Sequence, residues 1–145
     1  HFRPDIVLCN AISDRHTDHG KAGDLVSVAC FLSGLARIAT SWDGEVQKAW
    51  RPKVVYRYIQ DKFHTPDFVY DISKHFNRKM EAVLAFKTQF YNPDSAEPNT
   101  PISSMEFLEF LKARAITLGR PAGFNYAEGY NVERYIGIDS FGGIK

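Results

Sequence analysis

The stretch that decides the fold is residues 5–20, which read DIVLCNAISDRHTDHG. Residues 5–10 contain a continuous apolar run, Ile6 to Cys9, that is followed by the polar Asn10. This pattern is typical of a strand buried on both faces of a parallel sheet. Residues 14–20 then place two histidines and two carboxylates directly after that strand. Because open α/β sheets bind ligands beyond the carboxyl ends of their strands, we expect the chemistry of the chain in this loop.

Helix signals follow the loop. We expect Asp18 to cap a helix that runs to about Ile38. Its apolar residues recur at spacings of three and four, which predicts one buried stripe formed by Leu25, Val28, Leu32 and Leu35. Residues 40–52 are mixed and polar and indicate a loop.

The second half of the chain completes an α/β pattern. Strands are expected at residues 54–59 and 68–71, and an extended segment at residues 125–138. Ser73 is expected to cap a helix that reaches about Phe90. A capping box begins the last helix, which ends at Gly119; its two residues are Ser103 and Glu106. We predict an α/β fold with a Rossmann-like, mostly parallel sheet flanked by helices, as a single domain of residues 1–145.

Composition narrows the class of protein. The chain has 145 residues, is 44% hydrophobic and 24% charged, and has a net charge of +1, as one globular domain would. Because Lys and Arg are scattered, neither a nucleic-acid groove nor a membrane-surface helix is expected. No apolar run is long enough to span a membrane. Two isolated cysteines, Cys9 and Cys30, fit a reducing compartment, which predicts a soluble cytoplasmic protein.

The loop at residues 14–20 has the residue types that bind a metal or move a proton. His16 and His19 are three residues apart, with Asp18 between them. Zinc binds neutral imidazole whose other nitrogen is held by a carboxylate. A histidine paired with an aspartate is also a suitable general acid. From spacing alone, a polar surface loop in which Asp18 only caps the helix explains the pattern equally well.

The same loop, DRHTDHG, resembles the second metal motif of the zinc-dependent N-acetylglucosaminyl deacetylases, the PIG-L or LmbE-like family. Three further stretches resemble the family's bacillithiol-biosynthesis deacetylase, in the same order along the chain. They are FHTPDFVYDIS, FKTQF and YAEGY, which begin at Phe63, Phe86 and Tyr126. The resemblance implies Zn²⁺-dependent hydrolysis of the N-acetyl group of an amino-sugar substrate, N-acetylglucosaminyl malate. Family members also often form homo-oligomers.

The resemblance implies roles for three residues of the loop. His19 matches the family's zinc-ligating histidine. His16 matches the histidine that, when protonated, stabilises the oxyanion or protonates the leaving amine. Asp18 matches the carboxylate that orients this second histidine.

Four more residues are candidates for substrate binding. Arg15 would pair with the malate carboxylate, although an ion pair with Asp14 or plain solvation explains it as well. His64 lies in a loop, where a lone histidine is more often simply exposed. Tyr126 and Glu128 match a stretch near the family's active-site mouth, whereas an aromatic packed inward at a strand edge explains Tyr126 equally well.

One family motif does not occur in this sequence. The first motif, close to Ala-His-Pro-Asp-Asp, supplies two zinc ligands and the general base. By the resemblance, residues 1–145 correspond to the C-terminal portion of the LmbE-like fold, and we expect the chain alone to be inactive. The alternative is a non-catalytic fragment or interaction module, which bare sheet edges would favour.

Overall fold

The computed structural model describes residues 2–142 and 144. Contacts divide it into two compact units, the first formed by residues 2–68 and 129–142, the second by residues 69–128 and 144. The elements in chain order are β1 (Ile6–Cys9), α1 (Thr17–Ser33), β2 (Ser41–Trp42), β3 (Glu45–Val46), β4 (Val54–Tyr58), β5 (Phe68–Asp71), α2 (Phe76–Leu84), α3 (Met105–Gly119), the 3-10 turn η1 (Arg120–Ala122) and β6 (Ala127–Val132).

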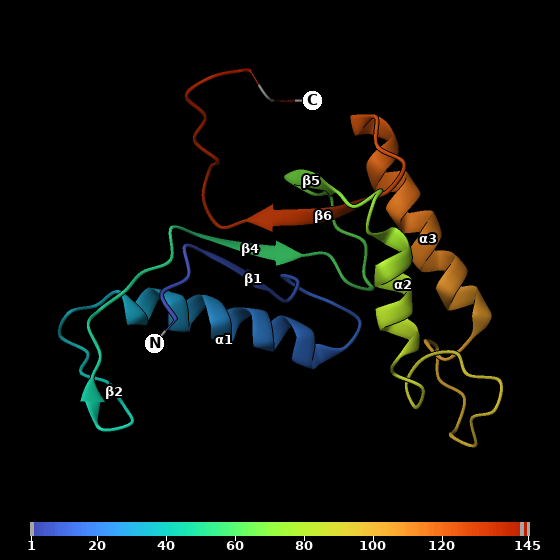
Figure 1. Cartoon of the computed structure of the whole chain (residues 1–145), viewed down its shortest axis with the longest axis horizontal. Helices are drawn as coiled ribbons and strands as arrows, with labels where there is room; N and C mark the ends of the chain where they lie inside the picture. Colours follow the sequence, from blue (N-terminus) through green and yellow to red (C-terminus); the bar gives the residue numbers. More distant parts are fainter. Residues whose placement is uncertain (1, 143, 145) are drawn as a thin grey trace. The chain divides into compact units, whose positions relative to one another are not determined.

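The main sheet has the strand order β1-β4-β6-β5 (Figure 1). β1 runs parallel to β4, with Ile6 opposite Val54 and Cys9 opposite Arg57. β4 runs antiparallel to β6. The predicted α/β class is therefore confirmed. The sheet is mixed, so the expectation of a mostly parallel sheet describes the β1–β4 pair and not the β4–β6 pair.

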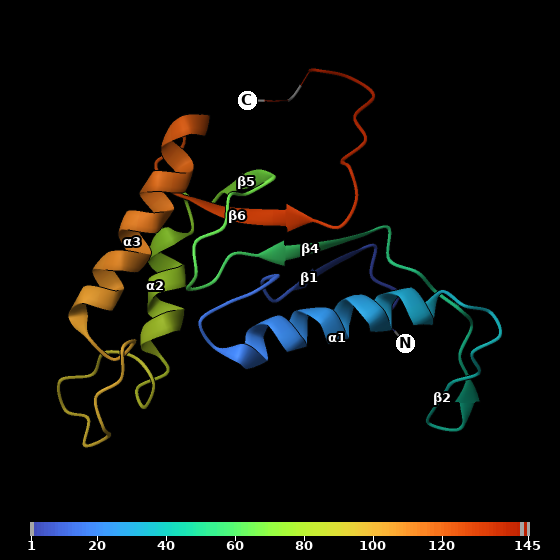
Figure 2. The same ribbon diagram turned by 180° about the vertical axis from the view of Figure 1, so that it is seen from behind.

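In the first unit, α1 lies along one face of β1 and β4 (Figures 1 and 2). Gly23 is the buried residue of the described helix. The predicted core stripe is wrong, because Leu25 is 71% exposed and Val28 55%. Leu25 follows Gly23 by two residues, and two steps of 100° place it on the opposite side of the helix. The side of α1 that carries Gly23 faces the sheet, where the two backbones come close together.

Burial on both faces of β1 is also not observed. Ile6 and Leu8 are 58% and 54% exposed, whereas Cys9 is buried. Side chains alternate along a strand, so Cys9 points to the face that α1 covers and Ile6 and Leu8 point to the other face.

The ends of α1 differ from those expected. His16, and not Asp18, is the N-cap, because its Nδ1 accepts from the Asp18 backbone N–H at 3.3 Å. The helix ends at Ser33 and not near Ile38. A Cβ on the C-cap residue Gly34 would lie 2.3 Å from the Arg51 side chain, so a larger residue there would require Arg51 to move.

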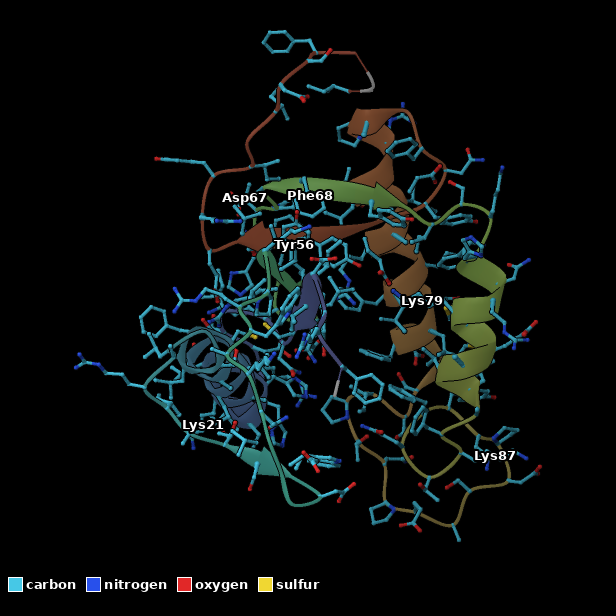
Figure 3. All side chains as sticks on the ribbon, turned by 60° about the vertical axis from the view of Figure 1, so that its left-hand side comes forward. Lys21, Tyr56, Asp67, Phe68, Lys79 and Lys87 are labelled. Carbon is cyan, nitrogen blue, oxygen red and sulfur yellow. The ribbon has the colours of Figure 1, made fainter. Side chains whose placement is uncertain are left out.

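The expected loop at residues 40–52 contains the short hairpin of β2 and β3, with Asp43 and Gly44 at positive φ in its turn. The strands predicted at residues 54–59 and 68–71 are confirmed as β4 and β5. In Figure 3 the labelled Tyr56, Asp67 and Phe68 lie near one another, and the Tyr56 and Phe68 rings meet edge to face at 4.9 Å.

The second unit contains the helices α2 and α3. Its core contains Ile72, Phe76 and Ala115, and the Phe76 ring stacks on Tyr126 at 4.0 Å. The last helix ends at Gly119, as predicted.

Both helix starts in the second unit differ from the expectation. The Ser73 hydroxyl donates to Asp71 Oδ1 at 2.5 Å instead of capping α2, which begins after His75 and ends at Leu84 rather than near Phe90. The cap of α3 is Ser104, one residue beyond the expected Ser103, whose hydroxyl bonds to Thr100.

Two further observations concern membrane spanning and the cysteines. Within residues 2–142 and 144, no helix combines the length and apolarity that crossing a membrane requires. Cys9 and Cys30 are free thiols, and burial raises the pKa of both, so neither is a reactive thiolate at neutral pH.

The packing of α1 gives a stability prediction with a matched control. A Cβ on Gly23 would lie 2.7 Å from the Asn10 carbonyl oxygen, whereas one on Gly20 meets only ordinary contacts from 3.4 Å. We expect Gly23→Ala to lower the free energy of unfolding by about 1–3 kcal/mol through overpacking. Gly20→Ala should leave it unchanged or raise it by up to about 1 kcal/mol, since alanine favours helix. Urea denaturation of the three proteins measures this, and equal effects would contradict the close approach.

Candidate active site

Two loops meet at the carboxyl ends of β1 and β4. Because these strands are parallel, the segments that follow them emerge at the same edge of the sheet. Gln60 Oε1 accepts from Asn10 Nδ2 at 2.9 Å and from the Ala11 backbone N–H at 3.3 Å. His64 Nε2 lies 2.7 Å from the Ser13 carbonyl oxygen. The two loops therefore form one polar site within the first unit.

His19 is held by a buried carboxylate. Its Nδ1 lies 2.5 Å from Asp14 Oδ2, and the Asp14 side chain is fully buried while that of His19 is 39% exposed. The other Asp14 oxygen accepts backbone N–H groups from Lys62 at 2.6 Å and Asp61 at 3.1 Å. Burial alone would raise the pKa of Asp14, but these hydrogen bonds together hold it below its ordinary value.

His16 is the exposed histidine of the pair. Its ring centroid lies 5.3 Å from that of His19. Its Nδ1 lies 3.7 Å from Asp18 Oδ2, within reach of an ion pair but longer than a hydrogen bond. The same nitrogen accepts from the Asp18 backbone N–H at 3.3 Å. A protonated His16 would lose that cap and have the Asp18 carboxylate beside it.

Arg15 forms an ion pair with a residue of the other loop. Its Nε donates to Asp61 Oδ2 at 2.5 Å, so the alternative of an ion pair with Asp14 is wrong. The Arg15 side chain is 49% exposed. His64, which could have been a simple exposed loop residue, is half-buried and bound to Ser13.

Tyr126 and Glu128 lie in the second unit and make contacts there. The Tyr126 ring stacks on Phe76, which matches the alternative of an aromatic packed inward. Glu128 Oε1 accepts from Lys79 Nζ at 2.5 Å, with both side chains about one-third exposed (Figure 3 labels Lys79). The structure thus brings together Arg15, His16, Asp18, His19 and His64, while Tyr126 and Glu128 belong to a separate unit.

The donor set fits one ligand of a zinc site. His19 has its Nδ1 engaged by a carboxylate, as metal-binding histidines generally do, which directs Nε2 away from that carboxylate. Across the part of the chain that the structure describes, no three His, Cys, Asp or Glu side chains come together to hold a metal ion. A catalytic zinc takes three protein ligands, so His19 can supply one of them.

Sequence reasoning missed two residues of this site, Asp14 as the partner of His19 and Gln60 as the link between the loops. Asp14 lies inside the loop that was singled out, but its backbone donors come from residues 61 and 62, more than 40 positions away. The strand predicted at residues 54–59 could have indicated these contacts. If it pairs in parallel with the strand at residues 5–10, the loop that follows it lies at the same edge of the sheet.

A buried arginine anchors α1 beneath the site. Arg57 Nη1 donates to Asp24 Oδ1 at 3.0 Å and Nε to Glu133 Oε1 at 2.9 Å, with only 10% of the Arg57 side chain exposed. Burial would lower the pKa of Arg57, but the two carboxylates more than compensate and raise it. The α1 helix is thus tied to both β4 and the segment after β6.

Comparison with known proteins supports the fold. No protein-family profile matches the sequence. The conserved protein TT1542 from Thermus thermophilus matches 96% of this chain with a TM-score of 0.75 and 25% identity. GalB, the 4-carboxy-2-hydroxymuconate hydratase from Pseudomonas putida KT2440, matches 96% with a TM-score of 0.67 and 17% identity. N,N′-diacetylchitobiose deacetylase from Pyrococcus horikoshii matches 90% with a TM-score of 0.68 and 21% identity.

These matches confirm the expected LmbE-like α/β fold, a sheet flanked by helices. The chain spans only 56%, 56% and 46% of the lengths of the three proteins, respectively. A hydratase and a deacetylase share this fold, so the fold by itself does not select the reaction. Only the residues of the site can indicate which reaction the chain serves.

Two arginines of the first unit give a paired prediction. Arg15→Ala removes a half-exposed ion pair and should lower the free energy of unfolding by at most about 1 kcal/mol. Arg57→Ala removes a buried guanidinium with its two charge-assisted hydrogen bonds. It should lower the free energy of unfolding by about 1–3 kcal/mol. Chemical denaturation at low salt and at about 1 M salt measures both, and only the Arg15 effect should vanish at high salt. A larger loss for Arg15→Ala would contradict this ranking.

Proposed function

We propose that this chain is part of a zinc-dependent deacetylase that hydrolyses the N-acetyl group of an N-acetylglucosaminyl conjugate. One observation supports the proposal most directly. Two histidines converge at the carboxyl end of β1, and they differ in environment: His19 is backed by a buried carboxylate, and His16 is exposed beside Asp18. One is suited to hold a metal and the other to move a proton.

In the proposed reaction, His19 is one of three protein ligands of the zinc. Zinc, when bound, polarises the acetyl carbonyl and lowers the pKa of its water. His16, charged and oriented by Asp18, stabilises the oxyanion or protonates the departing amine. A carboxylate base and the two other ligands would come from a motif like Ala-His-Pro-Asp-Asp, which this sequence lacks.

The proposed substrate is N-acetylglucosaminyl malate, as in bacillithiol biosynthesis. Arg15 supplies the guanidinium for the malate carboxylate; its Nε is engaged by Asp61, and the remaining donors of the fork have the geometry that carboxylates prefer. His64 is a further proposed substrate contact on the same unit, while the roles of Tyr126 and Glu128 stay predictions from the resemblance. The activity for which the Pyrococcus protein is named, on N,N′-diacetylchitobiose, is chemically the same class of amide hydrolysis on an amino sugar.

The alternative is a non-catalytic fragment or interaction module. Two measurements separate the proposals: the coding sequence upstream of His1, and acetate release by the purified 145-residue chain. A turn resembling His-Pro-Asp-Asp after an upstream strand favours the deacetylase. A true start at His1 favours the module, and acetate release by the pure 145-residue chain would then overturn it.

Substitutions of the two histidines test the roles in a protein that carries the complete ligand set. His19→Ala should abolish stoichiometric zinc and activity. His16→Ala should keep the zinc and lower kcat by about 10²–10⁴, the usual loss when a general acid is removed. Zinc is measured by plasma mass spectrometry, and acetate release from N-acetylglucosaminyl malate by a coupled assay.

His75→Ala is the matched control, since His75 is an exposed histidine of the second unit whose side chain makes no capping bond to α2. It should leave zinc and turnover unchanged. Full turnover in His19→Ala would exclude the proposed function.

A further inference from the structure

The carboxylate of Asp14 is unusual among the acidic groups of the site. Its side chain is fully buried, and both of its oxygens are engaged. Oδ2 faces His19 Nδ1 at 2.5 Å, while Oδ1 receives the backbone N–H groups of Lys62 and Asp61. Asp14 therefore connects the histidine at the start of α1 to the loop that follows β4.

Two groups compete for the same nitrogen of His19. Asp14 Oδ2 lies 2.5 Å from Nδ1, and Gln60 Nε2 lies 3.2 Å from it. The Gln60 amide is oriented by its oxygen, which accepts from Asn10 and Ala11, so its NH₂ group faces the ring. A carboxylate can only accept and an amide nitrogen can only donate. Nδ1 can satisfy one of them, as an N–H toward Asp14 or as a lone pair toward Gln60.

The geometry favours Asp14. Hydrogen bonds to a carboxylate are about twice as strong as neutral ones, and the contact to Asp14 is the shorter by 0.7 Å, the difference between 3.2 and 2.5 Å. The backbone donors on Oδ1 stabilise the ionised carboxylate, which leaves Oδ2 as an acceptor only. An unpaired buried carboxylate oxygen would also cost more than a partly exposed amide.

We propose that Asp14 is a positioning residue that holds His19 as the Nδ1–H tautomer, so that Nε2 presents the lone pair that binds the metal. This tautomer is the reverse of the one that an isolated histidine side chain favours in water. The assignment of Nε2 as the metal-binding atom rests on the proposed function. The tautomer of His19 is a property of the chain without metal.

The substitution Asp14→Asn should invert the tautomer. An asparagine oxygen can still accept from Lys62 and Asp61, which keeps the loop in place and directs the new NH₂ group at His19. Nδ1 then becomes an acceptor and the proton moves to Nε2. The variant would thus lose the metal-binding lone pair while keeping shape and volume.

The experiment is long-range ¹H–¹⁵N correlation on the 145-residue chain labelled with ¹⁵N-histidine, without metal, at a pH where the rings are neutral. We expect His19 to show a protonated Nδ1 and an unprotonated Nε2, and Asp14→Asn to show the reverse. Asp18→Asn, which alters the carboxylate near His16, should leave His19 as it is. A protonated Nε2 in the unmodified chain, or an unchanged tautomer in Asp14→Asn, would overturn the proposal.

Gln60→Ala provides a second variant that does not touch the carboxylate. Because the amide is not the partner of Nδ1, His19 should keep its Nδ1–H form; a switch would identify Gln60 as the partner and overturn the proposal. Addition of zinc alone to the protein with the complete ligand set separates the two hypotheses. If the tautomer is as expected but the His19 Nε2 signal does not respond to zinc, the metal role fails and the positioning role of Asp14 remains. If it responds, Asp14→Asn should weaken zinc binding by about 10–100-fold.

Discussion

The parallel pairing of β1 with β4 is the constraint on which the rest of the described site depends. It brings together two loops that lie about 50 residues apart in sequence, as the Asn10–Gln60 hydrogen bond shows. Gln60 contacts His19 from the loop after β4. Asp14, the other side-chain partner of His19, accepts from backbone N–H groups of the same loop. A one-residue slip of β4 would move the loop that follows it, with Gln60 and the Lys62 amide, by about 3.3 Å along the strand direction. The register of two short strands therefore sets the geometry of the histidine pair.

The two histidines show how environment separates residues that sequence makes look alike. They are three positions apart at the start of one helix, and each has an aspartate nearby. Asp14 is fully buried and receives backbone donors, whereas the Asp18 side chain is 74% exposed. A buried, hydrogen-bonded carboxylate fixes the ring that it contacts, and an exposed one at 3.7 Å leaves its ring free to change partner. This asymmetry is what a metal ligand and a proton carrier would each require.

The fold also shows why patterns of apolar residues can mislead about the core. Leu25, Val28 and Leu32 recur at helical spacing in α1, yet the helix approaches the sheet through Gly23, with the buried Arg57 beside the contact. The stripe remains exposed, as do Ile6 and Leu8 on the far face of β1. A glycine lets two backbones approach where no larger side chain fits, and that gain outweighs the stripe in choosing the helix face. The helix therefore faces the sheet with the side that carries Gly23.

By itself, the sequence determined the α/β class, the positions of β1, β4 and β5, the end of α3 at Gly119, and the loop that carries His16 and His19. These features depend on local preferences that a few neighbouring residues express: strand propensity, helix stop signals and the apolar run before a polar loop. Only the tertiary structure decided the cap by His16, the inward face of α1, the mixed sheet, and the pairing of His19 with Asp14 and of Arg15 with Asp61. The inward face of α1, the mixed sheet and the Arg15–Asp61 pair depend on groups that strand pairing and close packing bring together. The His16 cap and the Asp14–His19 contact join residues two and five positions apart, where the sequence offered more than one candidate.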